Sequence, residues 1–313
     1  MADKYLVTGG AGFIGSNIAE ELLSRGEQVR ILDDLSTGSE ENISSFKNDV
    51  DFIKGDIRNS IDVKRAVKDI DFVIHQAALG SVTRSLEEPM ETNDVNVSGT
   101  LNVLTNARRA GVKRLVFASS SSVYGKCKVF PQEESFKPCP ISPYAVSKLA
   151  GECYCGVFAE TMGLETVILR YFNVFGPRQN PRSKYSAVIP IFIRNLLNDR
   201  PCTINGDGAQ SRDFTFVSNV VNANISACTA SDAAGRVINV ARGENHSVQD
   251  VAEGIKKILN KNIDSVYGPD RAGDIKKSVA SIKVLKEVLK IETDVAFDEG
   301  LEKTVNWFLR YES

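Results

Sequence analysis

Short apolar runs recur along the chain, and helix-length segments separate them. The segments between the runs are amphipathic, such as GSNIAEELLSRG and VSGTLNVLTNARRAG. Near-continuous apolar strands that alternate with helices predict a parallel sheet covered on both faces, which is a doubly wound α/β fold. The runs cover residues 4–9, 28–34, 51–56, 71–77, 113–119, 165–172 and 236–241.

The first strand ends in TGGAGFIG, which has glycines at positions 9, 12 and 15 and opens the first helix. The first glycine permits the tight turn, the second lets the backbone approach a pyrophosphate, and the third allows close helix packing. The free N–H groups at the helix N-terminus attract the phosphates. This strand–turn–helix context predicts a dinucleotide site on a Rossmann sheet.

Two acids follow the next strands. Asp33 ends the second strand, where a carboxylate accepts hydrogen bonds from an adenosine ribose and repels a 2′-phosphate, so NAD is favoured over NADP. Asp56 ends the third strand and is expected near the adenine, although a capping role explains it almost as well.

The alternation of strands and helices ends near residue 175, where segments rich in Gly, Pro and Asn begin. We therefore expect a Rossmann domain over residues 1–174 and a smaller substrate-binding lobe over residues 175–313. The apolar run at 236–241 predicts that a segment around 213–242 returns to the main sheet.

Composition excludes several classes of function. The formal net charge is −2 without long runs of one sign, which favours neither nucleic acid nor an acidic membrane as partner. The sequence shows no signal-peptide stretch and no apolar run near the ~20 residues of a membrane span. The six cysteines lack paired CxxC spacing, which favours neither a disulfide framework nor a metal site. We expect a cytoplasmic protein without a bound metal.

A proton-transfer set follows the fifth strand. SPYAVSK places Tyr144 and Lys148 four residues apart, on one face of a helix. A phenol has a pKa near ~10, and a neighbouring ammonium lowers that pKa toward a useful value. The stretch FASSSSVYG carries four serines at the end of a buried strand. A serine, Tyr144 and Lys148 together are the minimum for moving a proton and a hydride at a carbinol.

These motifs resemble the extended short-chain dehydrogenase/reductase superfamily and, within it, the UDP-hexose 4-epimerases. The resemblance runs from residue 4 to about residue 285. The motifs that carry it are TGGAGFIG, DDLSTG, HQAALGSV, NDVNVSGT, SSSSVYG, SPYAVSK, RYFNVFGPRQ, SRDFTFV and RAGDI.

The resemblance implies site residues position by position. Catalysis would use Ser120, Tyr144 and Lys148, while Tyr124 would not be the base. NAD would contact Gly9, Gly12, Phe13, Ile14, Gly15, Asp33, Asp56, Ile57, Gln76, Asn96, Tyr144, Lys148 and Phe172. The UDP-sugar would contact Gly80, Ser81, Ser120, Ser121, Ser122, Asn173, Gln179, Arg212, Arg271 and Ser278, with the two arginines as clamps for the diphosphate.

The reaction implied is epimerisation at C4 through a 4-keto intermediate. Related dehydratases place an Asp-Glu pair where this chain has Ser121–Ser122, which disfavours elimination of water. UDP-glucuronate 4-epimerase and UDP-glucuronate decarboxylase remain alternatives on the same scaffold. A protein that binds NAD(H) only as a sensor or scaffold is disfavoured, because Ser120, Tyr144 and Lys148 are all retained.

The resemblance also bears on the sugar and on assembly. Ser278 aligns with a residue that walls the C2 side of the sugar in this family, where a bulky tyrosine admits only plain hexoses. A serine there predicts that UDP-N-acetylglucosamine and UDP-N-acetylgalactosamine are accepted, together with UDP-glucose and UDP-galactose. We further expect a homodimer that pairs helices 92–110 and 144–161, although packing within one chain explains their apolar residues equally well.

Overall fold

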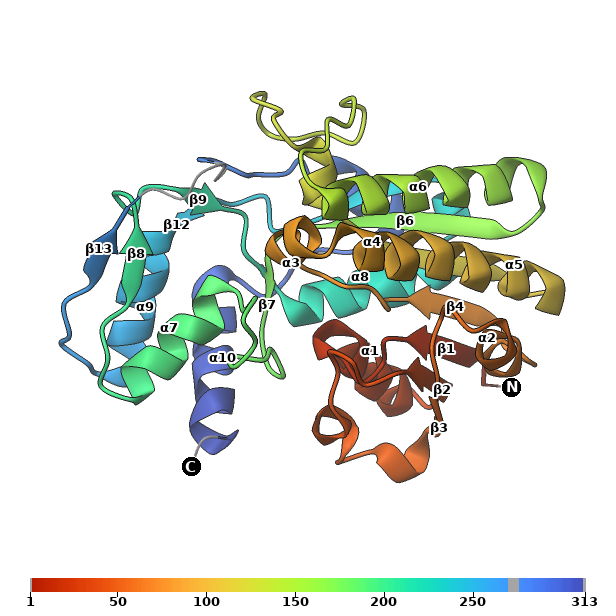
Figure 1. Cartoon of the computed structure of the whole chain (residues 1–313), viewed down its shortest axis with the longest axis horizontal. Helices are drawn as coiled ribbons and strands as arrows, with labels where there is room; N and C mark the ends of the chain where they lie inside the picture. The colour runs from red at the N-terminus through yellow and green to blue at the C-terminus, as the bar shows by residue number, and fades with distance from the viewer. Residues whose placement is uncertain (1, 270–275, 312–313) are drawn as a thin grey trace.

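A seven-stranded parallel sheet forms the centre of the molecule (Figure 1). The computed structural model describes residues 2–269 and 276–311. The order across the sheet is β11-β6-β5-β4-β1-β2-β3, with parallel pairing throughout. All seven apolar runs are strands of this one sheet, so the predicted doubly wound fold is confirmed. The strands are β1 (Lys4–Thr8), β2 (Gln28–Asp33), β3 (Asp51–Lys54), β4 (Phe72–His75), β5 (Arg114–Ser120), β6 (Glu165–Tyr171) and β11 (Val237–Val240).

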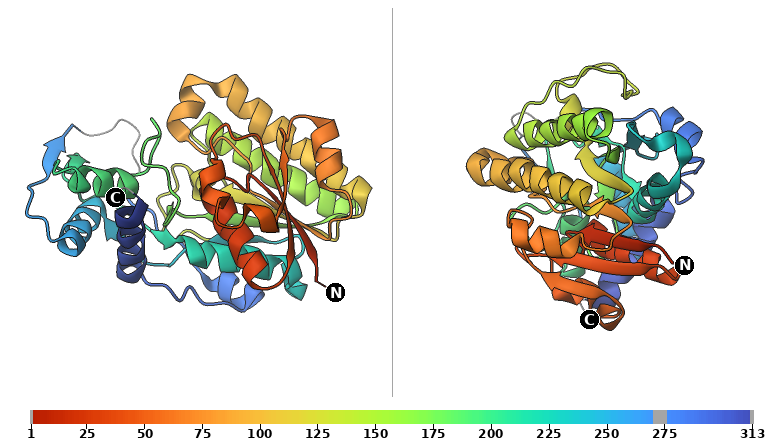
Figure 2. Two further views of the ribbon diagram at one scale, coloured as in Figure 1. Left: turned by 90° about the horizontal axis from the view of Figure 1, so that it is seen from below. Right: turned by 90° about the vertical axis from the view of Figure 1, so that its right-hand side faces the viewer.

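Helices cover both faces of the sheet, as the end-on view in Figure 2 shows. One face carries α1 (Phe13–Ser24) and α8 (Val217–Thr229), which pack against each other. The other face carries α2 (Ser60–Ala66), α5 (Thr100–Ala110) and α6 (Pro143–Thr161). The short helices α3 (Val82–Glu87) and α4 (Pro89–Asn93) precede a π-helical turn, η3 (Asp94–Gly99), that runs into α5.

The strands are buried on both sides because successive side chains point to opposite faces. In β5, Val116 and Ala118 join the hydrophobic core beneath α1 and α8, whereas Leu115 and Phe117 join the core beneath α2, α5 and α6. Helix α6 lies so close to β5 that a Cβ at Gly151 would collide with the Phe117 ring. This close packing sets the distance between α6 and the end of β5.

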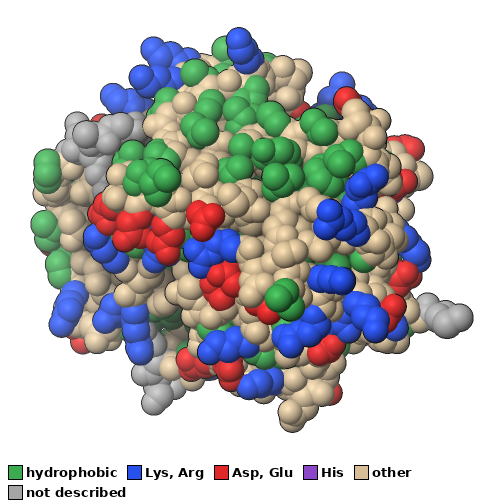
Figure 3. Space-filling model, turned by 45° about the vertical axis from the view of Figure 1, so that its right-hand side comes forward, with side chains coloured by type: hydrophobic (Ala, Val, Ile, Leu, Met, Phe, Trp, Pro, Cys, Tyr) green, Lys and Arg blue, Asp and Glu red, His purple; other side chains and the backbone are tan. Residues whose placement is uncertain are grey.

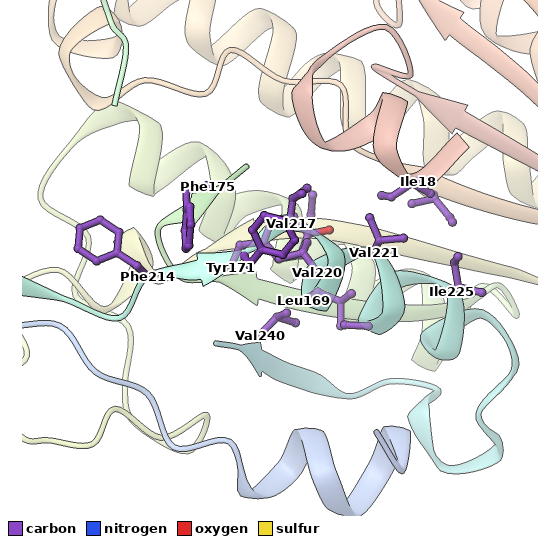
Figure 4. Packing of buried hydrophobic residues seen from close by; sticks show 14 of the residues in the cluster. Ile18, Leu169, Tyr171, Phe175, Phe214, Val217, Val220, Val221, Ile225 and Val240 are labelled. Carbon is purple, nitrogen blue, oxygen red and sulfur yellow. The ribbon is translucent and has the colours of Figure 1, made fainter. Parts of the chain in front are cut away.

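Helix α8 illustrates how the chain returns to the main sheet after residue 175. Its residues Val217, Val220, Val221 and Ile225 lie among Ile18 of α1, Leu169 of β6 and Val240 of β11 (Figure 4). The edge strand β11 pairs with β6, with Ile238 opposite Leu169. The strand expected at residues 236–241 is therefore part of the central sheet.

The remaining strands and α-helices lie beside the sheet, toward the left in Figure 1. They comprise helices packed on one another and short strand pairs, β10 with β7, β12 with β9 and β13 with β8. In the part of the chain that the structure describes, no helix is long and apolar enough to cross a membrane. The elements are β7 (Val174–Phe175), α7 (Val188–Leu197), β8 (Thr203–Asn205), β9 (Ser211–Arg212), β10 (Thr215–Phe216), β12 (His246–Ser247), α9 (Val248–Leu259), β13 (Val266–Gly268) and α10 (Phe297–Tyr311).

Candidate active site

A cavity of about 670 Å³ lies at the carboxyl ends of the central strands. It spans the point where the strand order reverses between β1 and β4, which is where doubly wound sheets bind dinucleotides. Its volume is in the range of cofactor pockets. Most of the residues expected to contact NAD line it, namely Gly9, Gly12, Phe13, Ile14, Gly15, Asp33, Asp56, Ile57, Gln76, Tyr144 and Lys148.

The glycine turn has the geometry that a pyrophosphate requires. Gly9 has φ +68°, and a Cβ there would lie 2.7 Å from the Ala77 nitrogen. A Cβ at Gly15 would collide with the Gly9 carbonyl oxygen. Helix α1 begins at Phe13, and no side chain caps its first turn. Its N–H groups are therefore available to a phosphate, and the residues present fit the dinucleotide.

Asp33 ends β2 and fixes the glycine turn. Its carboxylate accepts hydrogen bonds from the Ala11 nitrogen at 2.9 Å and from the Leu35 nitrogen at 2.8 Å. Burial raises the pKa of this carboxyl group, and the two N–H donors oppose that effect. Asp33 still lines the cavity, so it is placed to accept a ribose hydroxyl.

Asp56 lines the same cavity but is also engaged locally. It accepts hydrogen bonds from the backbone and guanidinium of Arg58, and the hydrogen bond from that side chain lowers its pKa. The cap of the following helix α2 is Asn59, so the capping role that the sequence offered for Asp56 is wrong, and Asp56 instead stabilises the turn before that helix.

Two residues expected to contact NAD line neither this cavity nor its neighbour. Asn96, in the π-helical turn η3, binds both backbone groups of Leu79 and the Ser147 hydroxyl. Phe172 is fully buried beside Tyr124 and Ala280. The sequence motif does not distinguish a residue that touches a ligand from one that supports the loop beneath it. Asn96 supports the loop of Leu79 and Gly80, and Phe172 packs beneath the strand ends.

A second cavity of about 380 Å³ adjoins the first. Gly80 and Tyr144 line both cavities. The residues expected to bind the sugar divide between them: Ser81 and Gln179 line the first, while Ser120, Ser121, Ser122, Asn173, Arg212 and Ser278 line the second. Arg271 lies outside the described residues. We refer to the second cavity as the sugar cavity.

The proton-transfer set meets where the two cavities join. Tyr144 is in the first turn of α6, and Lys148 follows one turn later on the same face. The Lys148 ammonium lies 5.9 Å from the centroid of the Tyr144 ring and donates a hydrogen bond to the Ala118 carbonyl at 2.9 Å. Ser120 is the last residue of β5 and lines the sugar cavity beside Tyr144.

Burial dominates the protonation of this set. It raises the pKa of Tyr144, and hydrogen bonding with Ser120 opposes that effect. Burial lowers the pKa of Lys148 to about 8. Lys148 is therefore mostly protonated at neutral pH, and its positive charge favours the phenolate form of the neighbouring tyrosine.

The four consecutive serines have different environments. Ser119 is buried and hydrogen-bonds the Glu152 carboxylate of α6, so it joins the strand to the helix. Ser120 accepts a hydrogen bond from the Ser122 nitrogen at 3.2 Å. Ser121 and Ser122 begin the 3₁₀ turn η4 (Ser121–Tyr124) and line the sugar cavity.

Tyr124 ends the same turn but faces away from both cavities. It is fully buried, and its hydroxyl donates a hydrogen bond to the Asn239 side chain at 2.7 Å. The Arg170 guanidinium lies 4.8 Å from the centroid of its ring. Tyr124 therefore has a packing environment, in contrast to Tyr144.

Several residues at the site carry no sequence signal that identifies them. Arg84 and Tyr185 line the first cavity, with the Arg84 guanidinium 4.9 Å from the centroid of the Tyr185 ring. The Tyr185 hydroxyl donates a hydrogen bond to the Glu87 carboxylate at 2.7 Å, which fastens the loop after β7 to α3. Gln132 lines the sugar cavity from a loop more than a hundred residues away from Ser278 in sequence.

Asp213 holds together the loops around Ser278 and Arg212. Its carboxylate accepts hydrogen bonds from the nitrogens of Arg242 at 2.9 Å, Gly243 at 3.0 Å and Ala280 at 3.2 Å. Burial raises the pKa of Asp213 to about 7. The Asp of the SRDF motif therefore positions its neighbours and does not line either cavity. In residues 2–269 and 276–311, no cluster of His, Cys, Asp or Glu is arranged to hold a metal ion.

Comparisons with known proteins agree with this geometry. Residues 5–241 match the NAD dependent epimerase/dehydratase family. A putative UDP-glucose 4-epimerase of Methanocaldococcus jannaschii is 38% identical over 304 residues, which cover 96% of this chain and 97% of the relative. A relative of different activity, the UDP-N-acetyl-alpha-D-glucosaminuronate decarboxylase of Bacillus cytotoxicus, is 34% identical over 325 residues and is covered completely, as is this chain.

A solved structure resembles the whole chain. The UDP-N-acetylglucosamine 4-epimerase of Methanobrevibacter ruminantium M1, in complex with UDP-N-acetylmuramic acid, superposes with a TM-score of 0.95 at 41% identity and covers 99% of this chain and 100% of its own. The match over residues 5–241 and the full-length relatives establish the family. The chain belongs to the NAD-dependent epimerase/dehydratase family and, within it, to the UDP-sugar 4-epimerases, which are isomerases that use NAD.

Proposed function

We propose that this epimerase interconverts UDP-N-acetylglucosamine and UDP-N-acetylgalactosamine and also accepts UDP-glucose and UDP-galactose. The observation that carries the proposal is the wall of the sugar cavity at Ser278, which is buried and lines the cavity with a small side chain. A serine leaves room for an acetamido group at C2. The substrate named for the Methanobrevibacter enzyme supports the same assignment.

The chain's own residues would move one proton at the C4 oxygen. Tyr144 takes the proton of the C4 hydroxyl, while the Ser120 hydroxyl hydrogen-bonds the same oxygen and Lys148 stabilises the phenolate. Bound NAD would supply reversible hydride transfer at C4. Tyr144 would return the proton to the C4 oxygen of the product, while the Ser120 hydroxyl holds that oxygen in place.

The described lining of the sugar cavity offers little that favours the alternative substrates. A second cation, in addition to the one that binds the diphosphate, would favour a glucuronate carboxylate. Among the described residues that line the sugar cavity, Arg212 is the only charged one. The same described lining contains no carboxylate, which a dehydratase would need to eliminate water. These features favour neutral hexoses over UDP-glucuronate.

The test is incubation of the purified protein with UDP-N-acetylglucosamine, UDP-glucose and UDP-glucuronate in turn, followed by separation of the products. We expect galacto products from the first two substrates and no carbon dioxide from the third. Ser278→Tyr should lose activity on the acetylated sugar and keep activity on UDP-glucose, whereas the control Ser278→Ala should keep both. Decarboxylation, or equal loss of both activities in Ser278→Tyr, would contradict the proposal.

Tyr144→Phe tests the proposed base separately. The variant should keep NAD bound, because only one hydroxyl at the edge of the cavity is removed, and it should lose turnover of every UDP-sugar. Bound NAD is measured by extraction and turnover by product separation. Unchanged activity would show that another group removes the proton.

We also propose that two copies of this chain pair through α6 and the neighbouring helices. Hydrophobic side chains gather on the upper part of the face in Figure 3, where α4, α5 and α6 lie. Met90 is 80% exposed, and Val146 and Val157, which lie on one side of α6, are 53% and 49% exposed. An apolar patch of this kind fits a self-association surface.

Light scattering after size exclusion tests the pairing. The protein should elute with the mass of two chains, and Val157→Glu should elute as one. The control Val266→Glu introduces the same charge at an exposed valine of β13, away from α6, and should leave the mass unchanged. A single-chain mass for the unaltered protein would refute pairing.

All six cysteines are free thiols, which supports the further proposal that the protein works in a reducing compartment such as the cytoplasm.

A further inference from the structure

Three polar side chains that line the sugar cavity have no hydrogen-bond partner among the described residues. The Ser122 hydroxyl oxygen is completely buried without a partner. The Gln132 side chain and the Ser278 hydroxyl also make no hydrogen bond to the described residues, although these residues are only 3% and 6% exposed. Polar side chains of largely buried residues are almost always paired, so the Gln132 amide and the Ser278 hydroxyl, which line the cavity, are available to a polar ligand there.

Gln132 is the largest of the three and is held rigidly beside Ser278. Its backbone nitrogen donates a hydrogen bond to the Val279 carbonyl at 2.8 Å, and its carbonyl accepts one from the Ser281 nitrogen at 2.9 Å. The Asn239 side chain donates a further hydrogen bond to the same carbonyl at 3.0 Å. The backbone is therefore fixed on both sides, and the side-chain amide is left to the cavity.

An amide has one carbonyl acceptor and two N–H donors, which match the N–H and carbonyl of an acetamido group. A plain hexose offers only a hydroxyl at C2, so part of the Gln132 amide would stay unpaired in its complex. A site that contains buried polar groups discriminates against ligands that leave those groups unpaired. The cavity beside Ser278 is thus chemically suited to a 2-acetamido sugar as well as wide enough for it.

We propose that Gln132 determines specificity by hydrogen-bonding the 2-acetamido group of the sugar. The inference rests on the proposed function, because it assumes that Ser278 faces the C2 side of the sugar. Gln132 is assigned no part in proton transfer; it contributes binding to acetylated substrates that plain hexoses do not obtain.

The experiment measures kcat and KM for UDP-N-acetylglucosamine and UDP-glucose with the unaltered protein, Gln132→Met and Gln132→Glu. Methionine keeps the length of the side chain and removes both hydrogen-bonding groups, whereas glutamate keeps the shape and the acceptor but removes the donors. Gln249→Met makes the same chemical change at an exposed position on α9 and serves as the matched control.

In Gln132→Met we expect KM for the acetylated sugar to rise roughly ten-fold, as for one lost hydrogen-bonding pair, with a much smaller rise for UDP-glucose. Gln132→Glu should also raise KM for the acetylated sugar more than KM for UDP-glucose, because its carboxylate cannot donate a hydrogen bond to the acetamido carbonyl. Gln249→Met should match the unaltered protein. If Gln132→Met does not fold, the isosteric Gln132→Glu decides.

Equal changes in KM for the two sugars, or no change, would overturn the role of Gln132 while leaving the proposed function intact. Failure of the unaltered protein to turn over UDP-N-acetylglucosamine would instead overturn the proposed function, and the inference with it. The unaltered protein and the variants therefore report on the two claims separately.

Discussion

The ion pair between Glu152 of α6 and Arg170 of β6 leads to a specific prediction for stability. The two side chains are 6% and 4% exposed. The Arg170 Nε and Nη2 atoms donate hydrogen bonds to the two carboxylate oxygens at 2.9 and 2.7 Å. The ion pair joins α6, the helix that carries Tyr144, to β6, the strand next to β5. Glu152→Gln would remove the ion-pair partner of the buried guanidinium and leave the Glu134 carboxylate, which makes no ion pair with it among the described residues, as the nearby negative charge.

The magnitude follows from this burial. Breaking a buried ion pair by removing one partner destabilises a protein by about 3–5 kcal/mol, because the remaining charge is left desolvated. For a chain of this size, each kcal/mol shifts the melting temperature by about 2 °C, so Glu152→Gln should melt about 6–10 °C lower. The double variant Glu152→Leu/Arg170→Met removes both charges and should lose much less than the sum of the two single variants.

Urea unfolding followed by circular dichroism measures these free energies. The control Glu299→Gln makes the same change in an ion pair on α10 whose members are both 52% exposed, and its effect should stay below about 1 kcal/mol. A loss of less than about 1 kcal/mol in Glu152→Gln, or a double variant as unstable as the sum of the single ones, would show that the buried pair does not stabilise the contact between α6 and β6.

Three further predictions concern the cofactor cavity. Asp33→Asn should weaken NAD binding roughly 10–100-fold, as for a lost charged hydrogen bond, and should reduce the discrimination against NADP. Equal NAD affinities of the variant and the unaltered protein, measured by titration, would contradict this. Gly15→Ala should lower both the amount of bound NAD and the melting temperature, because the new Cβ collides with the Gly9 carbonyl. The control is Gly156→Ala on α6, where a Cβ meets no atom within 4 Å, and the melting temperature should stay the same or rise. Burial lowers the pKa of Lys148 from 10.5 to about 8. Between pH 8 and pH 10.5 the unfolded chain therefore binds more protons at Lys148 than the folded chain does. The contribution of Lys148 to the free energy of unfolding consequently rises with pH. The stability of the unaltered protein relative to Lys148→Met, measured by urea unfolding, should therefore increase by about 3 kcal/mol from pH 7 to 10.5, and a constant difference would count against a buried, titrating ammonium.

The parts of the fold and site that the sequence predicted are those set by local pattern. Apolar runs marked every strand of the central sheet because both faces of that sheet are buried. The sequence predicted that the glycine turn, Asp33 and Tyr144 lie near one another, because the carboxyl ends of parallel strands meet at one edge of the sheet.

The parts that sequence did not predict depend on contacts between distant segments. Glu152 and Arg170 pair across a helix and a strand, and Asp213 joins three loops through backbone groups that leave no mark in the sequence. Gln132 comes from a loop that folds back on residues 279–281. Asn96 has a motif position and supports a loop instead of lining the cavity.

The most direct test of the central claim follows the hydrogen at C4 during turnover. UDP-N-acetylglucosamine carrying deuterium at C4 is incubated with the protein in ordinary water, and the products are examined by NMR. Oxidation at C4 and return of the same hydride predict UDP-N-acetylgalactosamine that keeps its deuterium. Absence of the galacto product, or a product whose C4 position has exchanged with water, would contradict the account.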